Sequence, residues 1–376
     1  MQGDGRGSEQ GHGHGSLRGP GHDPGADTPR GDAERSARTP RPGRFLAGLV
    51  RERSVQVTVA AAALVVVLLL LLARDALPFD WPAPGASRTV SGRLGDAALA
   101  FVEFVLLSLV VYALTRKRTI PDLASRAPER DLARRETLLL LAYGALGLAL
   151  GYGIAELLGW NAFGFHLAGS IYGTHAHVAV SEAIGWAAYN LLVYAVVPLL
   201  WFRRRYSTEQ LNLRSSNRRS DALVILVVLV LETAVQIAAL KPEIFDLSGR
   251  QLLLGVPLTF VLYLAGAVLP AMVFLYAILV PRFLKLTGSA ATTVILGGLT
   301  YTALHLWDAW TLFDSPGDAL LSLAFLLVTY FVPGMFKTVL TLRTGNAWVH
   351  VWAYHALAPH TLADTPGIVH VFGIKP

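Results

Sequence analysis

The sequence predicts an all-α, polytopic transmembrane helix bundle of about nine spans, with the N-terminus inside the cell and the C-terminus outside. Three observations predict this class. Apolar residues make up 53% of the 376-residue chain and charged residues only 15%, whereas soluble proteins average about 25% charged residues. The apolar residues form long unbroken runs, and Lys and Arg gather in alternate loops. This composition excludes a disordered chain, a fibrous protein and a water-soluble enzyme.

The spans follow from the apolar runs, because about 20 apolar residues cross the roughly 30 Å hydrocarbon core of a bilayer. The first run, at 55–73, consists almost entirely of Ala, Val and Leu. Further runs predict spans at 97–114, 137–156, 183–202, 222–240, 252–280, 290–307 and 319–336, and a shorter one at 346–358. The run at 252–280 is too long for one straight helix, and Pro257 and Pro270 inside it predict a kinked or broken span.

The N-terminal region has a different composition. Residues 1–44 are rich in Gly, Pro, Arg, Asp and Ser and hold almost no large apolar side chains. Such a segment cannot bury enough surface to offset its ordering entropy, so we expect a disordered cytoplasmic tail. Region 45–136 follows it with two transmembrane helices and a basic loop.

The loop charges predict the orientation. With the tail in the cytoplasm, most loop Lys and Arg residues fall inside, in the segments 115–136, 203–221, 281–289 and 337–345. The positive-inside rule then favours basic cytoplasmic loops in a multi-pass protein of the plasma membrane. We interpret the clusters at 116–118 and 203–205 as anchors near anionic lipid rather than as nucleic-acid contacts. The lipid bilayer is the first predicted partner, and nucleic acid is not one.

Ionisable groups inside the spans are candidates for function, since each costs about 2.5–3.5 kcal/mol on insertion scales. Those inside the predicted spans are Glu103, Glu232, His305, His350 and His355, and Glu182, Asp308 and His360 lie directly beside a span. His305 and Asp308 are three residues apart and share a helix face. The three C-terminal histidines are five residues apart, which on an α-helix places them on different faces, although two of them could converge with a ligand from another helix. The chain has no cysteine, so any metal must bind to His and carboxylate groups.

Two segments resemble a known family. Residues 281–307 hold Tyr301-x-x-x-His305 at the end of an apolar span, and residues 345–360 hold Gly-Asn-Ala-Trp followed by His355-Ala-Leu-Ala. Together with the linker 201–214, they resemble the CPBP family of intramembrane metalloproteases, which includes CAAX prenyl endopeptidases and bacteriocin-processing or immunity proteins. The resemblance covers 137–362, which we take as the CPBP-like bundle, and leaves 363–376 as a short C-terminal tail.

The family carries the motifs Glu-Glu-x-x-x-Arg, Phe-x-x-x-His and His-x-x-x-Asn or Asp, and this chain departs from the first and third. The glutamates are expected at Ala271 and Met272, and the arginine at Tyr276. Pro359 stands where the third motif expects Asn, with His360 directly after it. In the family a Glu activates water and two histidines hold the metal, so the resemblance implies that His305 and His355 bind zinc or another divalent metal. Two histidines make a weak site, because catalytic zinc usually has three protein ligands.

These observations leave three functions open. The first is a non-proteolytic or altered-site relative, a pseudoenzyme that binds a membrane peptide or protein partner in the former substrate cavity. The second is an active metal-dependent endopeptidase, a hydrolase that uses His305, His355 and a substitute carboxylate; Asp308 and His360 are then further metal ligands and Glu232 a catalytic base. The third is a small-solute transporter, with which the membrane glutamates, the interrupted run at 252–280 and the Gly- and His-rich outer loop 157–182 are compatible.

Overall fold

The computed structural model describes residues 48, 50–73, 89–167, 178–240 and 243–376. Helices account for most of this part of the chain, and the described residues include no strand. The prediction of a disordered tail concerns residues 1–44, which lie outside the described residues, as does the part of the outer loop that holds His175 and His177.

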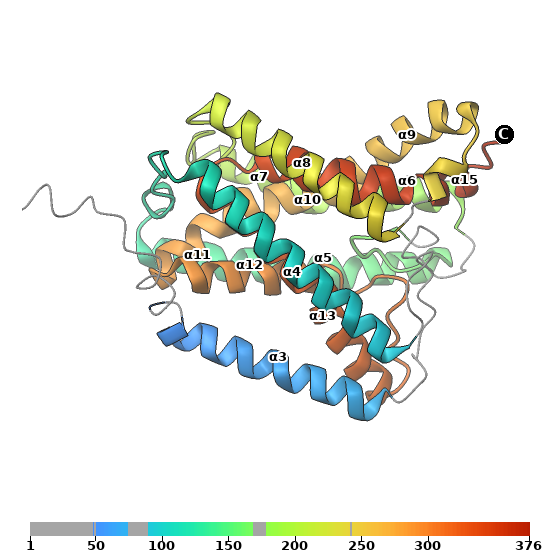
Figure 1. Ribbon diagram of the computed structural model, residues 1–376, viewed down its shortest axis with the longest axis horizontal. Coiled ribbons are helices and arrows are strands. Elements are labelled where there is room, and N and C mark those ends of the chain that lie inside the picture. Colours follow the sequence, from blue (N-terminus) through green and yellow to red (C-terminus); the bar gives the residue numbers. More distant parts are fainter. Residues whose placement is uncertain (1–47, 49, 74–88, 168–177, 241–242) are drawn as a thin grey trace, which may run out of the picture. The chain divides into compact units, whose positions relative to one another are not determined.

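Seven helical stretches are long and apolar enough to cross a membrane. They are α3 (Arg53–Leu72), α4 (Val90–Thr115), α5 (Arg130–Leu158), α6 to α7 (Val180–Arg203), α8 (Arg218–Leu240), α9 to α11 (Gly249–Thr287) and α13 (Pro316–Thr344). Each coincides with a predicted span. The region predicted at 290–307 forms the shorter apolar helix α12 (Ala290–Leu304). The chain is thus an integral membrane protein of the helical-bundle class (Figure 1), and the count of nine spans stays a prediction.

The stretch Gly249–Thr287 is one continuous helix whose turns change in width. It consists of α9 (Gly249–Tyr263), the π-helix η4 (Leu264–Val268), α10 (Leu269–Ala271), the π-helix η5 (Met272–Leu279) and α11 (Val280–Thr287). Pro270 follows directly after the first π segment. A π turn changes the hydrogen-bond pairing at the point where proline lacks a donor, so the helix continues past a residue that disrupts an α-helix. The expected break at Pro270 therefore takes the form of wider turns.

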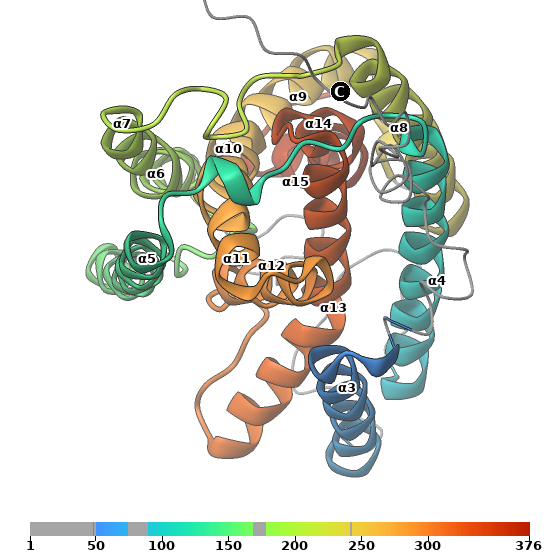
Figure 2. The ribbon, with the colours of Figure 1, turned by 90° about the vertical axis from the view of Figure 1, so that its left-hand side faces the viewer.

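The middle of this helix is the core of the bundle. Every residue from Ala271 to Val280 is buried, and an element that is apolar on all sides belongs in an interior. In Figure 2, α10 and α11 lie near α13 in the centre, with α5, α6 and α7 on one side and α4 and α8 on the other.

One buried ion pair attaches this core to its neighbours. Arg282 on α11 donates from Nε and Nη2 to Glu136 Oε2 of α5, at 2.9 and 2.7 Å. The hydroxyl of Tyr206, which follows α7, donates to the other carboxylate oxygen at 2.7 Å. The guanidinium also lies over the rings of Phe202 and Tyr206. The network satisfies both carboxylate oxygens and joins three segments that are distant in sequence.

The last long helix extends further than the sequence predicted. The predicted span 319–336 ends before Lys337, which places this lysine in the predicted inside loop 337–345. In the structure α13 continues to Thr344, and Lys337 is 1% exposed inside the bundle. Tyr301 and Tyr354 cover its ammonium group, with Nζ 3.7 and 5.1 Å from their ring centres. Lys337 is therefore an interior residue, and the loop interpretation of this lysine was wrong.

Helices α12 and α13 approach closely because small residues line their contact. A Cβ on Gly298 of α12 would lie 2.7 Å from the carbonyl oxygen of Phe331, and one on Gly334 would lie 2.6 Å from Cβ of Tyr301. Small residues at such positions let the backbones of membrane helices come together. This contact places Tyr301 and His305 against α13.

Gly298→Ala is expected to lower the free energy of unfolding by about 1–3 kcal/mol, because the new methyl group meets backbone that cannot move aside easily. Unfolding of the detergent-purified protein measures the change. Gly95→Ala on α4 is the matched control, since nothing lies within 4 Å of its added Cβ. Equal stability of the two variants would contradict the close α12–α13 packing.

Candidate functional site

Three histidines form a row on the helical segment near the C-terminus. The segment comprises α14 (Trp348–His350), the π-helix η6 (Val351–Leu362) and α15 (Ala363–Val371). The rings of His350 and His355 are 5.7 Å apart between centres, and those of His355 and His360 are 5.0 Å apart. A π-helix bonds residue i to i+5, so residues five apart lie nearly above one another. The sequence-based placement on different faces assumed α-helical turns, and it was wrong for that reason.

Two histidines from other segments continue the row. His166, between α5 and α6, has its ring 4.9 Å from that of His360 and 5.3 Å from that of His305. All five rings are buried. The row therefore joins three parts of the chain that are far apart in sequence.

The segment that carries His166 is fastened into the bundle. The carbonyl oxygen of Gly164 accepts from Trp186 Nε1 at 2.8 Å and from Asn190 Nδ2 at 2.9 Å. A Cβ on Gly164 would overlap Asp308, so only glycine allows this close approach. The backbone N–H of His166 then donates to Asp308 Oδ1 at 3.2 Å.

Asp308 is the centre of the first group of possible ligands. Its Oδ2 accepts from His305 Nδ1 at 3.1 Å and from the hydroxyl of Tyr330 on α13 at 2.5 Å, and it lies 3.6 Å from His166 Nδ1. The His305 ring stacks on that of Tyr330 with 3.7 Å between centres. Both carboxylate oxygens are thus engaged, and the His305 ring has a fixed orientation.

A second group of possible ligands also pairs a histidine with an aspartate and shares His166 with the first group. His360 Nδ1 donates to Asp364 Oδ2 at 2.8 Å, and the His360 ring stacks on Tyr263 at 4.4 Å. The ligand atoms of His166, His305 and Asp308 lie within 4.8 Å of one another, as do those of His166, His360 and Asp364. His166 belongs to both groups.

This arrangement fits a divalent metal such as zinc. A metal-binding histidine commonly donates a hydrogen bond from its other ring N–H to a carboxylate. His305 has this contact with Asp308, and His360 has it with Asp364. The Nε2 atom of His305 is buried without a hydrogen-bond partner, so it has a lone pair or proton that nothing in the described chain satisfies. With Zn–N bonds of about 2.0–2.1 Å, imidazoles on one tetrahedral zinc have ring centres about 5 Å apart. The observed 4.9 and 5.3 Å agree with that spacing.

The structure brings some of the sequence-predicted residues together and separates others. His305, Asp308 and His360 lie in the two ligand groups. His355 is their neighbour but belongs to neither group; its Nε2 lies 3.0 Å from the hydroxyl of Tyr301. Glu232 is on α8, where its Oε1 accepts from Gln236 at 2.9 Å, so nothing places it as a base beside His305.

The positions that the resemblance assigns to the first and third family motifs all lie in described helices. Ala271, Met272 and Tyr276 lie in the buried central helix, and the Tyr276 ring packs on His350 with 4.2 Å between centres. Pro359 is inside the π-helix directly before His360. Apolar side chains thus occupy the interior positions where the resemblance expects carboxylates.

Sequence reasoning missed His166 and Asp364. A signal for Asp364 was present, because His360-Thr-Leu-Ala-Asp364 has the His-x-x-x-Asp spacing of the third family motif, five residues after the alignment on His355. His166 had only a weak signal, a loop that is rich in glycine and aromatic residues and holds no Lys or Arg. Its role depends on tertiary packing against Asp308.

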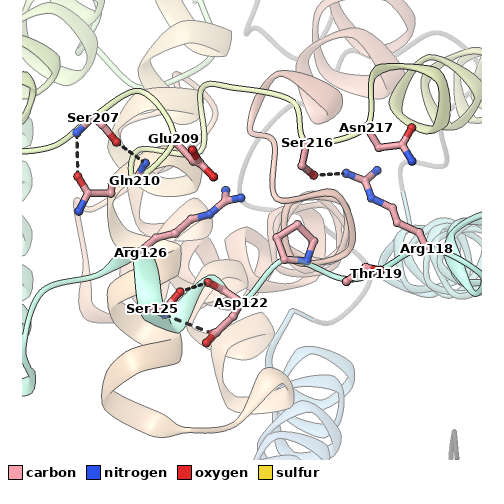
Figure 3. A pocket seen from close by; sticks show the side chains of 11 residues that line it. Arg118, Thr119, Asp122, Ser125, Arg126, Ser207, Glu209, Gln210, Ser216 and Asn217 are labelled. Carbon is pink, nitrogen blue, oxygen red and sulfur yellow. Dashed lines mark hydrogen bonds between the residues drawn. The ribbon is translucent and has the colours of Figure 1, made fainter. Parts of the chain in front are cut away.

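One pocket lies away from the histidines. A polar pocket of about 600 Å³ lies between the segment that follows α4 and the segment that follows α7 (Figure 3). Arg126 lines it and donates to Asn212 Oδ1 and the Gly345 carbonyl, both at 2.7 Å. Burial lowers the pKa of this guanidinium, and Glu209 opposes that shift. Arg118 on the opposite wall pairs with Asp221. The arginines thus hold loop ends together, and none of the histidines lines this pocket.

Comparison of the chain with protein-family models, with curated proteins and with solved structures found no match.

Proposed function

We propose that this protein is an altered-site relative of the CPBP intramembrane metalloproteases that binds a divalent metal, zinc in the first instance, inside the bundle. The observation that carries the proposal is the buried convergence of His166, His305 and Asp308 beside His360 and Asp364. Polar groups at this depth are costly and mark functional sites by default. Imidazole and carboxylate are ligands that zinc accepts.

Within this proposal, His166 and His305 are the nitrogen ligands of the first group and His166 and His360 those of the second, and Asp308 and Asp364 orient the rings of His305 and His360. A zinc ion at such a site supplies Lewis acidity and lowers the pKa of bound water. The protein residues supply a fixed and buried set of donors.

The proposed relative does not cleave peptides. A general base needs a free acceptor within hydrogen-bond reach of the water proton. Asp308 is the carboxylate nearest His305, but its two oxygens already accept from His305, Tyr330 and the His166 backbone. Ala271 and Met272 stand where the resemblance expects the glutamates. We therefore favour metal-dependent binding of a membrane peptide or protein over hydrolysis, in a plasma-membrane protein with cytoplasmic basic loops.

Metal analysis of the purified protein tests the proposal. We expect stoichiometric zinc in the wild type and loss of most of it in His305→Ala. His350→Ala is the matched control, because His350 is equally buried but lies outside both ligand groups. Wild-type protein without stoichiometric zinc, or zinc that His305→Ala leaves unchanged, would contradict metal binding at this site.

A cleavage assay distinguishes the non-proteolytic relative from the active endopeptidase. The zinc-loaded protein is incubated with a lipid-modified reporter peptide in detergent micelles. We expect no cleavage above that of the His305→Ala variant. Zinc-dependent cleavage that Asp308→Asn abolishes would support the active endopeptidase with Asp308 as the substitute carboxylate.

A further inference from the structure

The polar pocket of Figure 3 lies where helices of spanning length end. Its first wall belongs to the segment between α4, which ends at Thr115, and α5, which begins at Arg130. Its second wall belongs to the segment between α7, which ends at Arg203, and α8, which begins at Arg218. Helices that cross a bilayer end near the level of the lipid headgroups. The pocket of about 600 Å³ is therefore within reach of a headgroup phosphate.

Arg126 presents unused hydrogen-bond donors to this pocket. The residue is only 9% exposed, and its Nη1 donates to Asn212 Oδ1 and to the carbonyl oxygen of Gly345, both at 2.7 Å. Among the described residues, no hydrogen bond or ion pair uses its Nε or Nη2. Figure 3 shows the guanidinium extending from one wall of the pocket toward the other. A guanidinium that is fixed at one nitrogen and free at the other two is suited to bidentate binding of phosphate.

The two arginines of the pocket differ in how their charges are balanced. Arg118 pairs with Asp221, and its Nη2 donates to Ser216 Oγ at 2.9 Å. Arg126 forms no ion pair among the described residues. The carboxylate that interacts most strongly with it is Glu209 on the other wall, which is exposed. The positive charge of Arg126 is therefore available to an anion, and Glu209 is close enough to compete with that anion.

The charge around the pocket also favours an anion. The wall segments, taken as 116–130 and 203–219, hold eleven Lys and Arg residues but only three Asp and Glu residues. Most of these basic side chains are exposed. The predicted orientation places both segments on the cytoplasmic face, where the lipid surface is negative. Exposed basic groups raise the local concentration of anions, and the buried Arg126 supplies a fixed contact among them.

We propose that this pocket binds the phosphate group of an anionic phospholipid headgroup, with Nε and Nη2 of Arg126 as the donors. The volume of the pocket is that of a small-molecule site. The excess of basic residues around it favours an anionic headgroup over a zwitterionic one. The proposal adds a defined site to the general attraction between basic loops and lipid, and it uses none of the proposed zinc ligands.

Lipid-dependent stability tests the proposal. The detergent-purified protein is unfolded by heat in mixed micelles that contain either phosphatidylglycerol or phosphatidylcholine at the same mole fraction. We expect phosphatidylglycerol to give a Tm about 5 °C higher, because a ligand that binds only the folded state stabilises it. Native mass spectrometry should show one retained phosphatidylglycerol per chain.

Three variants separate the pocket from the charged surface around it. Arg126→Gln should lower the affinity for phosphatidylglycerol by about 10–100-fold, because it removes the charged donors. Arg204→Gln is the matched control: this exposed arginine does not line the pocket, so the affinity should fall by about twofold or less. Glu209→Gln removes the competing carboxylate and should raise the affinity by about two- to fivefold. A merely structural role of these residues would not produce that gain.

Equal wild-type Tm values in the two micelles, with no retained lipid, would overturn the proposal. Equal losses of affinity in Arg126→Gln and Arg204→Gln would do the same, because the basic surface would then attract lipid without the pocket. Inorganic phosphate at equal ionic strength distinguishes the sources of the anion. If it raised the Tm as much as phosphatidylglycerol does, the pocket would belong to a soluble phosphate compound instead of a lipid.

The Glu209 variant keeps the test decisive if Arg126→Gln misfolds. Glu209 is exposed, and its side chain makes no hydrogen bond among the described residues, so its replacement leaves the fold intact. An unchanged or lower affinity of Glu209→Gln for phosphatidylglycerol would place the lipid outside this pocket.

Discussion

Replacement of Arg282 with methionine is expected to lower the free energy of unfolding by about 3–5 kcal/mol, the largest stability effect that we predict for a single change. Removal of one partner from a buried ion pair leaves the other charge without compensation. Here Glu136 would lose both guanidinium bonds and keep only the bond from Tyr206. Chemical unfolding of the protein in mixed micelles measures the loss.

Two companion variants sharpen this experiment. Arg205→Met removes an exposed arginine that follows α7, and we expect a change below about 1 kcal/mol. The double variant Glu136→Gln/Arg282→Met also removes the carboxylate that Arg282→Met leaves unpaired, so it should recover part of the lost free energy of unfolding. If Arg282→Met were no less stable than Arg205→Met, the network would not hold α11 against α5.

Asp308→Asn is expected to weaken zinc binding by about 10–100-fold, which is the usual effect of removing a carboxylate that orients a metal-binding histidine. Asparagine keeps the shape of the side chain but offers one acceptor oxygen instead of two. It therefore cannot accept from His305, Tyr330 and the His166 backbone in the present arrangement. Competition with a chromophoric zinc chelator measures the affinity.

Asp314→Asn provides the control, since this carboxylate lies shortly after Asp308 in sequence but is exposed and belongs to neither ligand group. We expect its zinc affinity to equal that of the wild type. Complete loss of zinc in Asp308→Asn would make Asp308 a direct ligand. Unchanged affinity would exclude Asp308 from the site in either role.

The sequence was sufficient for the coarse fold, because span-length apolar runs have few alternatives in a bilayer. It placed all seven long apolar helices. It misplaced Lys337, since a lysine after an apolar run normally marks the end of a span, and only the rings of Tyr301 and Tyr354 show why this one lies inside. Cation–π contacts of this kind depend on tertiary packing and leave no local pattern.

The candidate site was harder to predict for two physical reasons. A π-helix has no distinctive composition, so the five-residue spacing of His350, His355 and His360 indicated separate faces under α-helical geometry. His166 reaches His305 only because Gly164 allows the loop to touch Asp308, across a long separation in sequence. His305 and Asp308 were predictable because they are local neighbours.

Zinc K-edge X-ray absorption of the purified protein tests the central claim most directly. We predict a first shell of nitrogen and oxygen donors at about 2.0–2.2 Å, with the outer-shell scattering of imidazole rings, and loss of that signal in His166→Ala. His166 is decisive because it belongs to both ligand groups. A protein that retains no zinc, or a zinc shell that His166→Ala and His305→Ala leave unchanged, would contradict a metal site among these histidines.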